Sequence, residues 1–375
     1  MKRIALFSIL LAACGDNSKS VDTTPDGRDE PMVGPPRAVV VAGDFVTPGF
    51  SGVMSKLELS SMQMTQNVAP AGAIGNDPII RKLGDDLYVV NRAGGNNVTI
   101  FDSATLAVKE QLGTGAGSNP QDVATFGTKV YVAAMGTKGV VVLTRGSATT
   151  KTIDLSALDP DGFPDCVSAY RVGNLLYVAC GLLDQNFSPR GNGVVAVINP
   201  ITDTVERTVT LSSPNPFGVF TELPGGEGLV IPTFDYAAPT ARCLEHITTG
   251  SAPFSKGCLV QYAAVGGYVV RAVPQQVGET QMLWMVVNNG NFSAEKARLW
   301  GYDLKSKTLW PDPLSPEAQV LTDLAACPNG QVIVADKTMS ANGLRVYDGA
   351  STMEMTTGAL AIGLRPQSSP SIVCY

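Results

Sequence analysis

The amino-acid sequence predicts an all-β fold, a seven-bladed β-propeller closed by its C-terminal strand, which joins the N-terminal blade. Three observations carry this prediction. From Ala38 onward, short apolar runs rich in Val, Ile and Tyr alternate with turn-forming residues, and none keeps a helical period for long. One such run recurs seven times. The 39 Gly and 25 Pro residues indicate many turns and few long helices.

The recurring run is clearest in Leu87-Tyr88-Val89-Val90-Asn91, and its relatives begin near residues 38, 130, 175, 228, 282 and 331. A second apolar run follows each one, such as 98–102, with weaker equivalents at 55–59 and 258–262. A third strand comes next, and a fourth starts near an Xaa-Pro pair such as Asn119-Pro120. Four short strands in about 40–50 residues are typical of a propeller blade.

The two ends of the repeat predict how the ring closes. Arg365-Pro366-Gln367 resembles Asn119-Pro120-Gln121, the start of an inner strand, and no such strand precedes Ala38. We therefore expect residues 367–375 to supply the innermost strand of the blade that residues 38–70 begin. Closure of this kind leaves the ring without an open end.

The repeat resembles the YVTN family of seven-bladed propellers. Leu87-Tyr88-Val89-Val90-Asn91, then residues 97–105 (NVTIFDSAT), then Gly117-Ser118-Asn119-Pro120 reproduce the order of that family's motif. Blade 2 matches well and blades 3 and 4 adequately. Blades 5 and 6 depart from the pattern, and the Asn-Pro start is lacking after residues 268–278. The resemblance implies a seven-bladed propeller, and some seven-bladed relatives are lactonases.

The N-terminus predicts export and a lipid anchor. Lys2 and Arg3 precede a ten-residue apolar run, which is too short to span a bilayer but suits a signal peptide. Leu11-Ala12-Ala13-Cys14 resembles the lipobox of bacterial lipoproteins, which implies removal of residues 1–13 and acylation of Cys14. The polar residues 14–37 then form a flexible tether, and residues 38–375 form the propeller. The alternative is an ordinary export signal with a chance cysteine.

Composition excludes several functions. A net charge of −6, with 27 basic and 33 acidic residues, gives no basic footprint for nucleic acid. A single histidine in the chain argues against His-based metal sites and His-dependent catalysis. No phosphate-binding loop, GxSxG motif or paired carboxylates are present, so the sequence predicts no cofactor, no metal and no catalytic residue.

Six cysteines remain once Cys14 is acylated, and export permits disulfides. Cys166 and Cys180 are equidistant from Gly173, so a hairpin centred there places them opposite each other. Cys243 and Cys258 close a long segment of blade 5. Cys327 and Cys374 then pair the last blade with the closing strand. A metal cluster is the alternative, but no CxxC spacing or His partner supports it.

Function is expected where loops surround the channel mouth. Two loops are long, 181–193 and 234–257, and long loops on a rigid ring commonly bind partners. Polar residues that follow the recurring run form a candidate binding rim: Asp44, Asn91, Arg92, Asp235, Tyr236, Asn288, Asn289, Asp336 and Lys337. Asn and Asp also end strands for turn reasons alone, which is the competing interpretation.

Two further features have a plain interpretation that competes with a functional one. His246, beside Glu245 in the second long loop, is the only side chain with an ordinary pKa near neutrality, but a lone loop histidine is usually inert. Asp159-Pro160-Asp161-Gly162 lies near Asp154 and Asp165 and could ligate calcium. It lacks the twelve-residue calcium-loop pattern, so a turn is expected.

The sequence predicts a membrane-anchored lipoprotein propeller that acts as a non-enzymatic binding or scaffold module at the cell envelope. Its acyl anchor would place it on the bacterial outer membrane, on the surface or periplasmic face, because Asp16 stands one place beyond the position that favours inner-membrane retention. The protein or glycan partner is unknown. The alternative is a lactonase-like hydrolase at the channel mouth, with rim carboxylates and His246 as acid and base.

Overall fold

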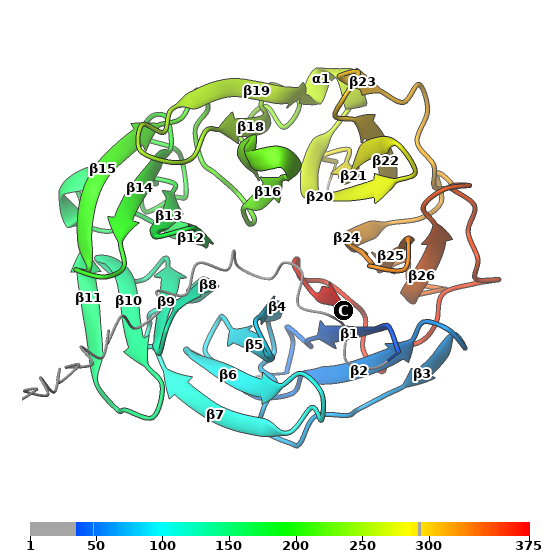
Figure 1. Ribbon diagram of the computed structural model, residues 1–375, viewed down its shortest axis with the longest axis horizontal. Coiled ribbons are helices and arrows are strands. Elements are labelled where there is room, and N and C mark those ends of the chain that lie inside the picture. Colours follow the sequence, from blue (N-terminus) through cyan, green and yellow to red (C-terminus); the bar gives the residue numbers. More distant parts are fainter. Residues whose placement is uncertain (1–34, 48, 292–293) are drawn as a thin grey trace, which may run out of the picture.

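The protein is a ring of seven antiparallel sheets around a central channel, as the computed structural model shows for residues 35–47, 49–291 and 294–375 (Figure 1). The expected all-β propeller is confirmed. The expected signal peptide, Cys14 and most of the expected tether fall outside the described residues. Among the residues described, no helix is long and apolar enough to cross a membrane.

Blades 1 to 4 each have four strands, which follow one another from the channel outward. Blade 1 is β27 (Ile372–Cys374), β1 (Arg37–Ala42), β2 (Val53–Glu58) and β3 (Gln63–Thr65). Blade 2 is β4 (Pro78–Leu83), β5 (Asp86–Asn91), β6 (Asn97–Asp102) and β7 (Val108–Gly113). Blade 3 is β8 (Pro120–Phe126), β9 (Lys129–Ala134), β10 (Gly139–Thr144) and β11 (Thr150–Asp154). Blade 4 is β12 (Cys166–Val172), β13 (Leu175–Cys180), β14 (Val194–Asn199) and β15 (Thr204–Thr210).

Blades 5 to 7 are less regular. Blade 5 is β16 (Thr221–Leu223), β17 (Gly228–Pro232), β18 (Cys243–Ile247) and β19 (Ser255–Gln261). Blade 6 is β20 (Tyr268–Val277), β21 (Thr280–Asn288), β22 (Ala297–Asp303) and β23 (Thr308–Leu309). Blade 7 has three strands, β24 (Leu321–Ala326), β25 (Gln331–Asp336) and β26 (Gly343–Asp348). The short helices are η1 (Ser156–Leu158), η2 (Pro224–Gly226) and α1 (Tyr262–Val265).

The second strand of each blade is buried on both faces, which explains its unbroken apolar run. In β5, Leu87 and Val89 pack toward blade 1, while Tyr88 and Val90 pack toward blade 3. Every residue of β5 is buried. A strand sandwiched between two neighbouring sheets needs apolar side chains on both sides, so the alternation expected of a half-exposed strand is absent.

The ring is closed as the sequence predicts. β27 pairs antiparallel with β1, with Val39 opposite Val373. Tyr375 also pairs with Arg37 through two backbone hydrogen bonds, of 2.8 and 2.9 Å. The last strand of the chain therefore completes the first blade, and β1 is not left as the inner edge of that sheet.

Three disulfides form, and they are the three expected pairs. Cys166–Cys180 joins β12 to β13, and the two residues are opposite each other in register. Cys327–Cys374 joins the end of β24 to β27 and so ties blade 7 to blade 1. Cys243–Cys258 joins the adjacent strands β18 and β19. The prediction that this bond closes a long loop is therefore wrong, because 243–247 is itself a strand of the blade.

Candidate functional site

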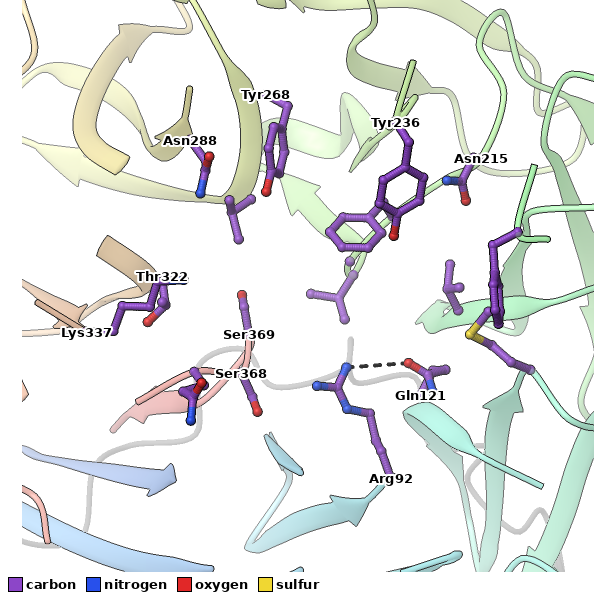
Figure 2. A pocket seen from close by; sticks show the side chains of 18 of the residues that line it. Arg92, Gln121, Asn215, Tyr236, Tyr268, Asn288, Thr322, Lys337, Ser368 and Ser369 are labelled. Atoms are coloured by element: carbon purple, nitrogen blue, oxygen red, sulfur yellow. Dashed lines mark hydrogen bonds between the residues drawn. The ribbon is translucent and has the colours of Figure 1, made fainter. Parts of the chain in front are cut away.

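A cavity of about 440 Å³ lies at one end of the channel, in the range of sites for small molecules. We call it the mouth cavity. Its walls come from the starts of the inner strands and from the loops that follow the second strands. Its apolar lining residues, other than aromatic ones, are Met135, Val167, Leu183, Val219, Val270 and Leu321. Tyr236 and Tyr268 stand on one side of the cavity, beside Asn215 and Asn288, and Arg92 and Gln121 stand across from them (Figure 2). We call the side with the aromatic rings the aromatic wall and the side with Arg92 the polar wall.

Blades 4 to 6 supply the aromatic wall, which consists of Phe187, Phe217, Tyr236 and Tyr268. The buried ring of Phe234 supports it from behind, with its centroid 4.7 Å from that of Tyr236 and 4.4 Å from that of Tyr268. Phe187 and Tyr236 are each 58% exposed and Phe217 is 37% exposed. Large rings held open to solvent by a rigid support offer a preformed apolar surface to a ligand.

Burial strengthens the hold of the Tyr268 hydroxyl on its proton. It raises the pKa of that phenol to about 12, so the group stays neutral at physiological pH. A neutral phenol can both donate and accept a hydrogen bond. The aromatic wall therefore carries a polar group that is ready to orient a ligand.

Arg92 and Gln121 stand on the polar wall, opposite Tyr236 and Tyr268 (Figure 2). One Arg92 terminal nitrogen donates to Asp77 at 2.5 Å, and the other donates to Gln121 at 3.4 Å. Ser368 from the closing segment donates to the same Asp77 carboxylate at 3.0 Å. The Arg92 Nε is buried and has no hydrogen-bond partner among the described residues. Asp77 thus orients groups from two blades toward the cavity.

Lys337, Glu295 and Asn288 form the second polar cluster, from blades 6 and 7. The Lys337 ammonium lies 2.7 Å from one Glu295 oxygen, and the Asn288 amide donates to the other at 2.6 Å. Each cation that lines the cavity is therefore already paired with a carboxylate. The described wall carries balanced charge, which favours a polar but uncharged ligand over an ion.

A ring of polar contacts lies below the cavity and joins the inner strands. On one side Arg81 donates two hydrogen bonds to Asp122, of 2.8 and 2.7 Å, and Ser168 donates to the same carboxylate at 2.7 Å. On the other side Asp323 accepts hydrogen bonds from both backbone and side chains of the closing segment, at 2.5–3.1 Å. We call these contacts the channel belt.

Arg271 completes the belt, with its Nε 3.7 Å from Asp323. Burial lowers the pKa of Arg271 to about 10 and raises the pKa of Asp323. Both shifts reflect the cost of charge in a confined channel. Because Ser369 both lines the cavity and donates to Asp323, the belt forms the floor of the cavity.

Four of the nine expected rim residues line the mouth cavity: Arg92, Tyr236, Asn288 and Lys337. Asn91 and Asp336 do not, since both are fully buried within their blades. Asn91 bonds Gly75 and Asn97, and Asp336 pairs with Arg345 at 2.7 Å. Their expected place at the rim is wrong.

The other three expected rim residues shape loops. Asp44 accepts the Val46 backbone N–H, Asp235 pairs with Arg242, and the Asn289 side chain accepts the Lys296 backbone N–H. None of the three lines the cavity. These three residues fit the competing interpretation, in which Asn and Asp follow strands because they stabilise turns.

His246 is not in a loop. It lies in β18, is only 6% exposed, and its Nε2 is 2.9 Å from the Glu227 carbonyl oxygen. Burial lowers its pKa, so it is neutral at physiological pH. It does not line the cavity. The lactonase hypothesis that used His246 and Asp336 as acid and base therefore lacks the geometry it needs.

The aspartate cluster near residue 160 forms a turn, and an arginine of a neighbouring loop pairs with two of its aspartates. Arg190, from the loop after β13, pairs with Asp159 at 3.2 Å and with Asp161 at 2.8 Å. Asp165 accepts the Leu183 backbone N–H at 2.9 Å, which anchors the same loop. Burial raises the pKa of Asp165 to about 6. The cluster therefore fixes the loop that carries Phe187.

Sequence reasoning missed several lining residues that the structure brings to the cavity. They are Gln121, Phe187, Asn215, Phe217, Tyr268, Glu295, Thr322, Gln367, Ser368 and Ser369. A signal existed for some of them. Gln121, Asn215 and Gln367 stand within one residue of the Pro that marks an inner strand, and every inner strand begins at the mouth.

No family model and no curated protein matches the chain by sequence. Solved structures share its fold. The periplasmic gluconolactonase PpgL of Pseudomonas aeruginosa is 15% identical, with a TM-score of 0.60 over 90% of this chain and 99% of that one. A candidate 6-phosphogluconolactonase of Bacteroides uniformis is 12% identical, with a TM-score of 0.63 over 91% and 100%. AztD of Citrobacter koseri is 13% identical, with a TM-score of 0.54 over 91% and 98%. At these identities the likeness concerns the propeller fold alone.

Proposed function

We propose that the mouth cavity binds a small, uncharged, polyhydroxylated ring compound such as a monosaccharide, and that it does so without turnover. The observation that carries the proposal is the division of the cavity into two unlike walls. Tyr236 and Phe217 offer ring faces, on which the C–H face of a sugar ring can pack. Gln121 and Ser368 on the other side offer hydrogen bonds to hydroxyl groups.

The charge balance of the walls supports the uncharged ligand. Arg92 is paired with Asp77 and Lys337 with Glu295, so an anion would have to compete with two carboxylates already in contact. The belt beneath is balanced in the same way, by the pairs Arg81–Asp122 and Arg271–Asp323. A buried charge without a new partner is costly, whereas hydroxyl groups can share the existing donors and acceptors.

Calorimetry with matched ligands tests the proposal. A panel of neutral monosaccharides is titrated beside the corresponding sugar acids, so that each pair differs in one carboxylate. We expect the neutral member of at least one pair to bind at least about tenfold tighter, a difference of about 1.4 kcal/mol. Preference for the acid would contradict the charge argument, and no binding by any member would remove the proposal.

A lactonase is the second candidate function, favoured by the neighbours of that name and by one geometric feature. Glu295 is the only carboxylate that lines the cavity among the described residues. In a hydrolase Glu295 would activate water, while Arg92 or Lys337 would stabilise the oxyanion. Hydrolysis of glucono-1,5-lactone by the wild type, abolished in Glu295→Gln, would establish this function. Turnover no faster than the buffer rate would leave binding alone.

We further propose that the YVTN-like propeller is a lipoprotein held at the bacterial outer membrane through Cys14, as a binding or scaffold module. The polar tether that follows supports this, because it would hold the ring away from the membrane. Cys14→Ser is expected to abolish metabolic labelling by a fatty acid and to release the protein from membranes. Protease treatment of intact cells then distinguishes the surface from the periplasmic face.

A further inference from the structure

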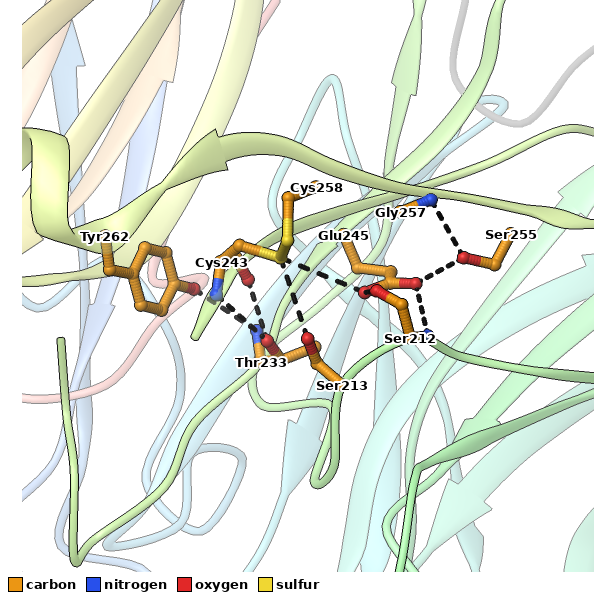
Figure 3. Close-up of a disulfide and its surroundings, with 9 residues drawn as sticks. All are labelled: Ser212, Ser213, Thr233, Cys243, Glu245, Ser255, Gly257, Cys258 and Tyr262. Atoms are coloured by element: carbon orange, nitrogen blue, oxygen red, sulfur yellow. Dashed lines mark hydrogen bonds between the residues drawn. A yellow bond between two sulfur atoms is a disulfide. The ribbon is translucent and has the colours of Figure 1, made fainter. Parts of the chain in front are cut away.

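Three residues of types that can ligate a metal meet on one face of blade 5 (Figure 3), and none of them lines the mouth cavity. Cys243 and Glu245 are two residues apart on β18, so their side chains lie on the same face of the sheet. Cys258 on β19 stands opposite Glu245 in register. The two sulfur atoms and a carboxylate oxygen all lie within 4.8 Å of one another.

Glu245 is buried without a cation. Its residue is 0% exposed, and no Lys or Arg among the described residues pairs with it. Three neutral donors hold the carboxylate instead: the Ser212 backbone N–H at 2.7 Å, the Ser212 hydroxyl at 2.6 Å and the Ser255 hydroxyl at 2.5 Å. A fully buried carboxylate usually has a positive partner, and Glu245 has only neutral ones.

One neighbour of Cys243 would favour a thiolate there, and another would repel it. The Ser213 hydroxyl lies 3.7 Å from the Cys243 sulfur, where it can donate to it, and a Glu245 oxygen lies 3.9 Å from the same sulfur. A disulfide sulfur gains little from such a donor, whereas a thiolate is a far better acceptor. Two adjacent anions, a thiolate and a carboxylate, would repel each other unless a cation lay between them.

We propose that reduction of Cys243–Cys258 converts this cluster into a site for a borderline-soft divalent cation such as Zn²⁺. A dithiol reductant supplies two electrons and becomes a cyclic disulfide, and the two cysteines become thiols. Each thiol then loses its proton as the metal binds, so two thiolates and the Glu245 carboxylate surround one cation. Water fills the fourth position. Ligands of one tetrahedral zinc lie roughly 3.5–4 Å apart. A Glu245 oxygen already lies 3.9 Å from the Cys243 sulfur, and the two sulfur atoms, which are now bonded, would separate on reduction.

The position of this disulfide suits exchange better than that of the others. Cys258 is the only exposed residue of the six disulfide-bonded cysteines. An external thiolate can reach Cys258, form a mixed disulfide with it, and release buried Cys243 as the leaving group. Cys166 and Cys180 are both 0% exposed, so the same attack there requires the blade to open.

Site-resolved alkylation tests the proposal on the full chain. The protein is reduced with a phosphine, with or without Zn²⁺, then treated with iodoacetamide, and each cysteine is followed by peptide mass spectrometry. We expect Zn²⁺ to slow alkylation of Cys243 and Cys258 at least about tenfold and to leave the other four disulfide cysteines unprotected. Co²⁺ in place of Zn²⁺ should give a thiolate-to-metal absorption band.

Two variants separate a metal site from a structural effect. Glu245→Gln keeps the shape of the side chain but removes the carboxylate that would ligate the metal. Loss of a group that only hydrogen-bonds a metal ligand lowers metal affinity roughly 10- to 100-fold, so we expect the affinity of Glu245→Gln for Zn²⁺ to fall by more than that. Ser213→Ala should show that smaller loss. Equal alkylation with and without Zn²⁺, protection of other cysteines, or unchanged affinity in Glu245→Gln would overturn the proposal. Loss of the near-ultraviolet circular dichroism on reduction despite Zn²⁺ would also overturn it, because the site requires a folded blade.

Discussion

Three of the four rings of the aromatic wall and the Arg92–Gln121 part of the polar wall come from different kinds of blade. Arg92 and Gln121, on the polar wall, belong to blades 2 and 3, which follow the sequence repeat closely. Phe217, Tyr236 and Tyr268, on the aromatic wall, belong to blades 5 and 6, which depart from it. The regular blades build the ring, and the irregular blades give one sector of its mouth a distinct surface. Departure from a repeat is therefore informative about where such a ring is specialised.

The largest expected effect is on the free energy of unfolding, when a residue of the channel belt is removed. Asp323→Ala leaves Arg271 and the donors of the closing segment without their acceptor in a buried position. Breaking such a buried cluster costs about 3–5 kcal/mol. We expect a loss of that size in the free energy of unfolding, measured by denaturant titration.

Asp122→Ala is the matched control on the other side of the belt. It should also lower stability, because Arg81 and Ser168 lose their acceptor, but it leaves the contacts of β27 intact. Digestion by carboxypeptidase should therefore accelerate only in Asp323→Ala. Equal digestion of both variants would show that Asp323 does not hold the closing strand.

The next effect concerns the aromatic wall. Tyr236→Ala removes a ring that is 58% exposed and supported by Phe234, so a bound sugar loses an apolar surface. Affinity should fall about 10- to 100-fold, the equivalent of losing the burial of one large side chain. Tyr236→Phe should retain most of it. Phe254→Ala, which removes a ring that is 55% exposed away from the cavity, should change nothing in calorimetry.

The regular part of the ring is predictable from the sequence. The recurring run at 87–91 coincides with β5, which spans Asp86–Asn91, and the closing strand expected within 367–375 is β27, which spans Ile372–Cys374. These elements are predictable because a strand buried on both faces must be apolar throughout. Turn residues such as Asn119-Pro120 then separate one strand from the next.

Blade 5 shows why the rest could not be predicted. β18 reads Cys-Leu-Glu-His-Ile, and its buried glutamate and histidine are satisfied by Ser212 and by Glu227, contacts that no local pattern reveals. The local sequence therefore indicates a loop where the chain forms a strand. The aromatic wall escapes prediction for a similar reason, since Phe217 and Tyr268 lie in different blades and meet only through the curvature of the ring.

A smaller effect is expected on the polar wall. Gln121→Leu removes a hydrogen-bonding group that also contacts Arg92, while keeping a side chain of similar size. One neutral hydrogen bond is worth about 0.5–1.5 kcal/mol, so affinity should fall less than about tenfold. Gln276→Leu, at the far end of β20, is the control. A loss larger than that of Tyr236→Ala would mean that the polar wall dominates recognition.

The smallest effect is a pH dependence confined to the aromatic sector, through the loop that carries Phe187. Burial raises the pKa of Asp165 to about 6, above its ordinary value of 3.8. Between pH 4 and 6 the folded protein thus holds a proton that the unfolded chain has released, so this group lowers stability as pH rises through that window.

Asp165→Asn removes the buried charge and keeps an oxygen for the Leu183 backbone N–H. At pH 7.5 its Tm should exceed that of the wild type by a few degrees, and the difference should vanish near pH 4. The difference should vanish because the wild-type carboxyl is protonated near pH 4 and then resembles the neutral amide. A Tm difference that instead grew toward pH 4 would contradict the raised pKa of Asp165.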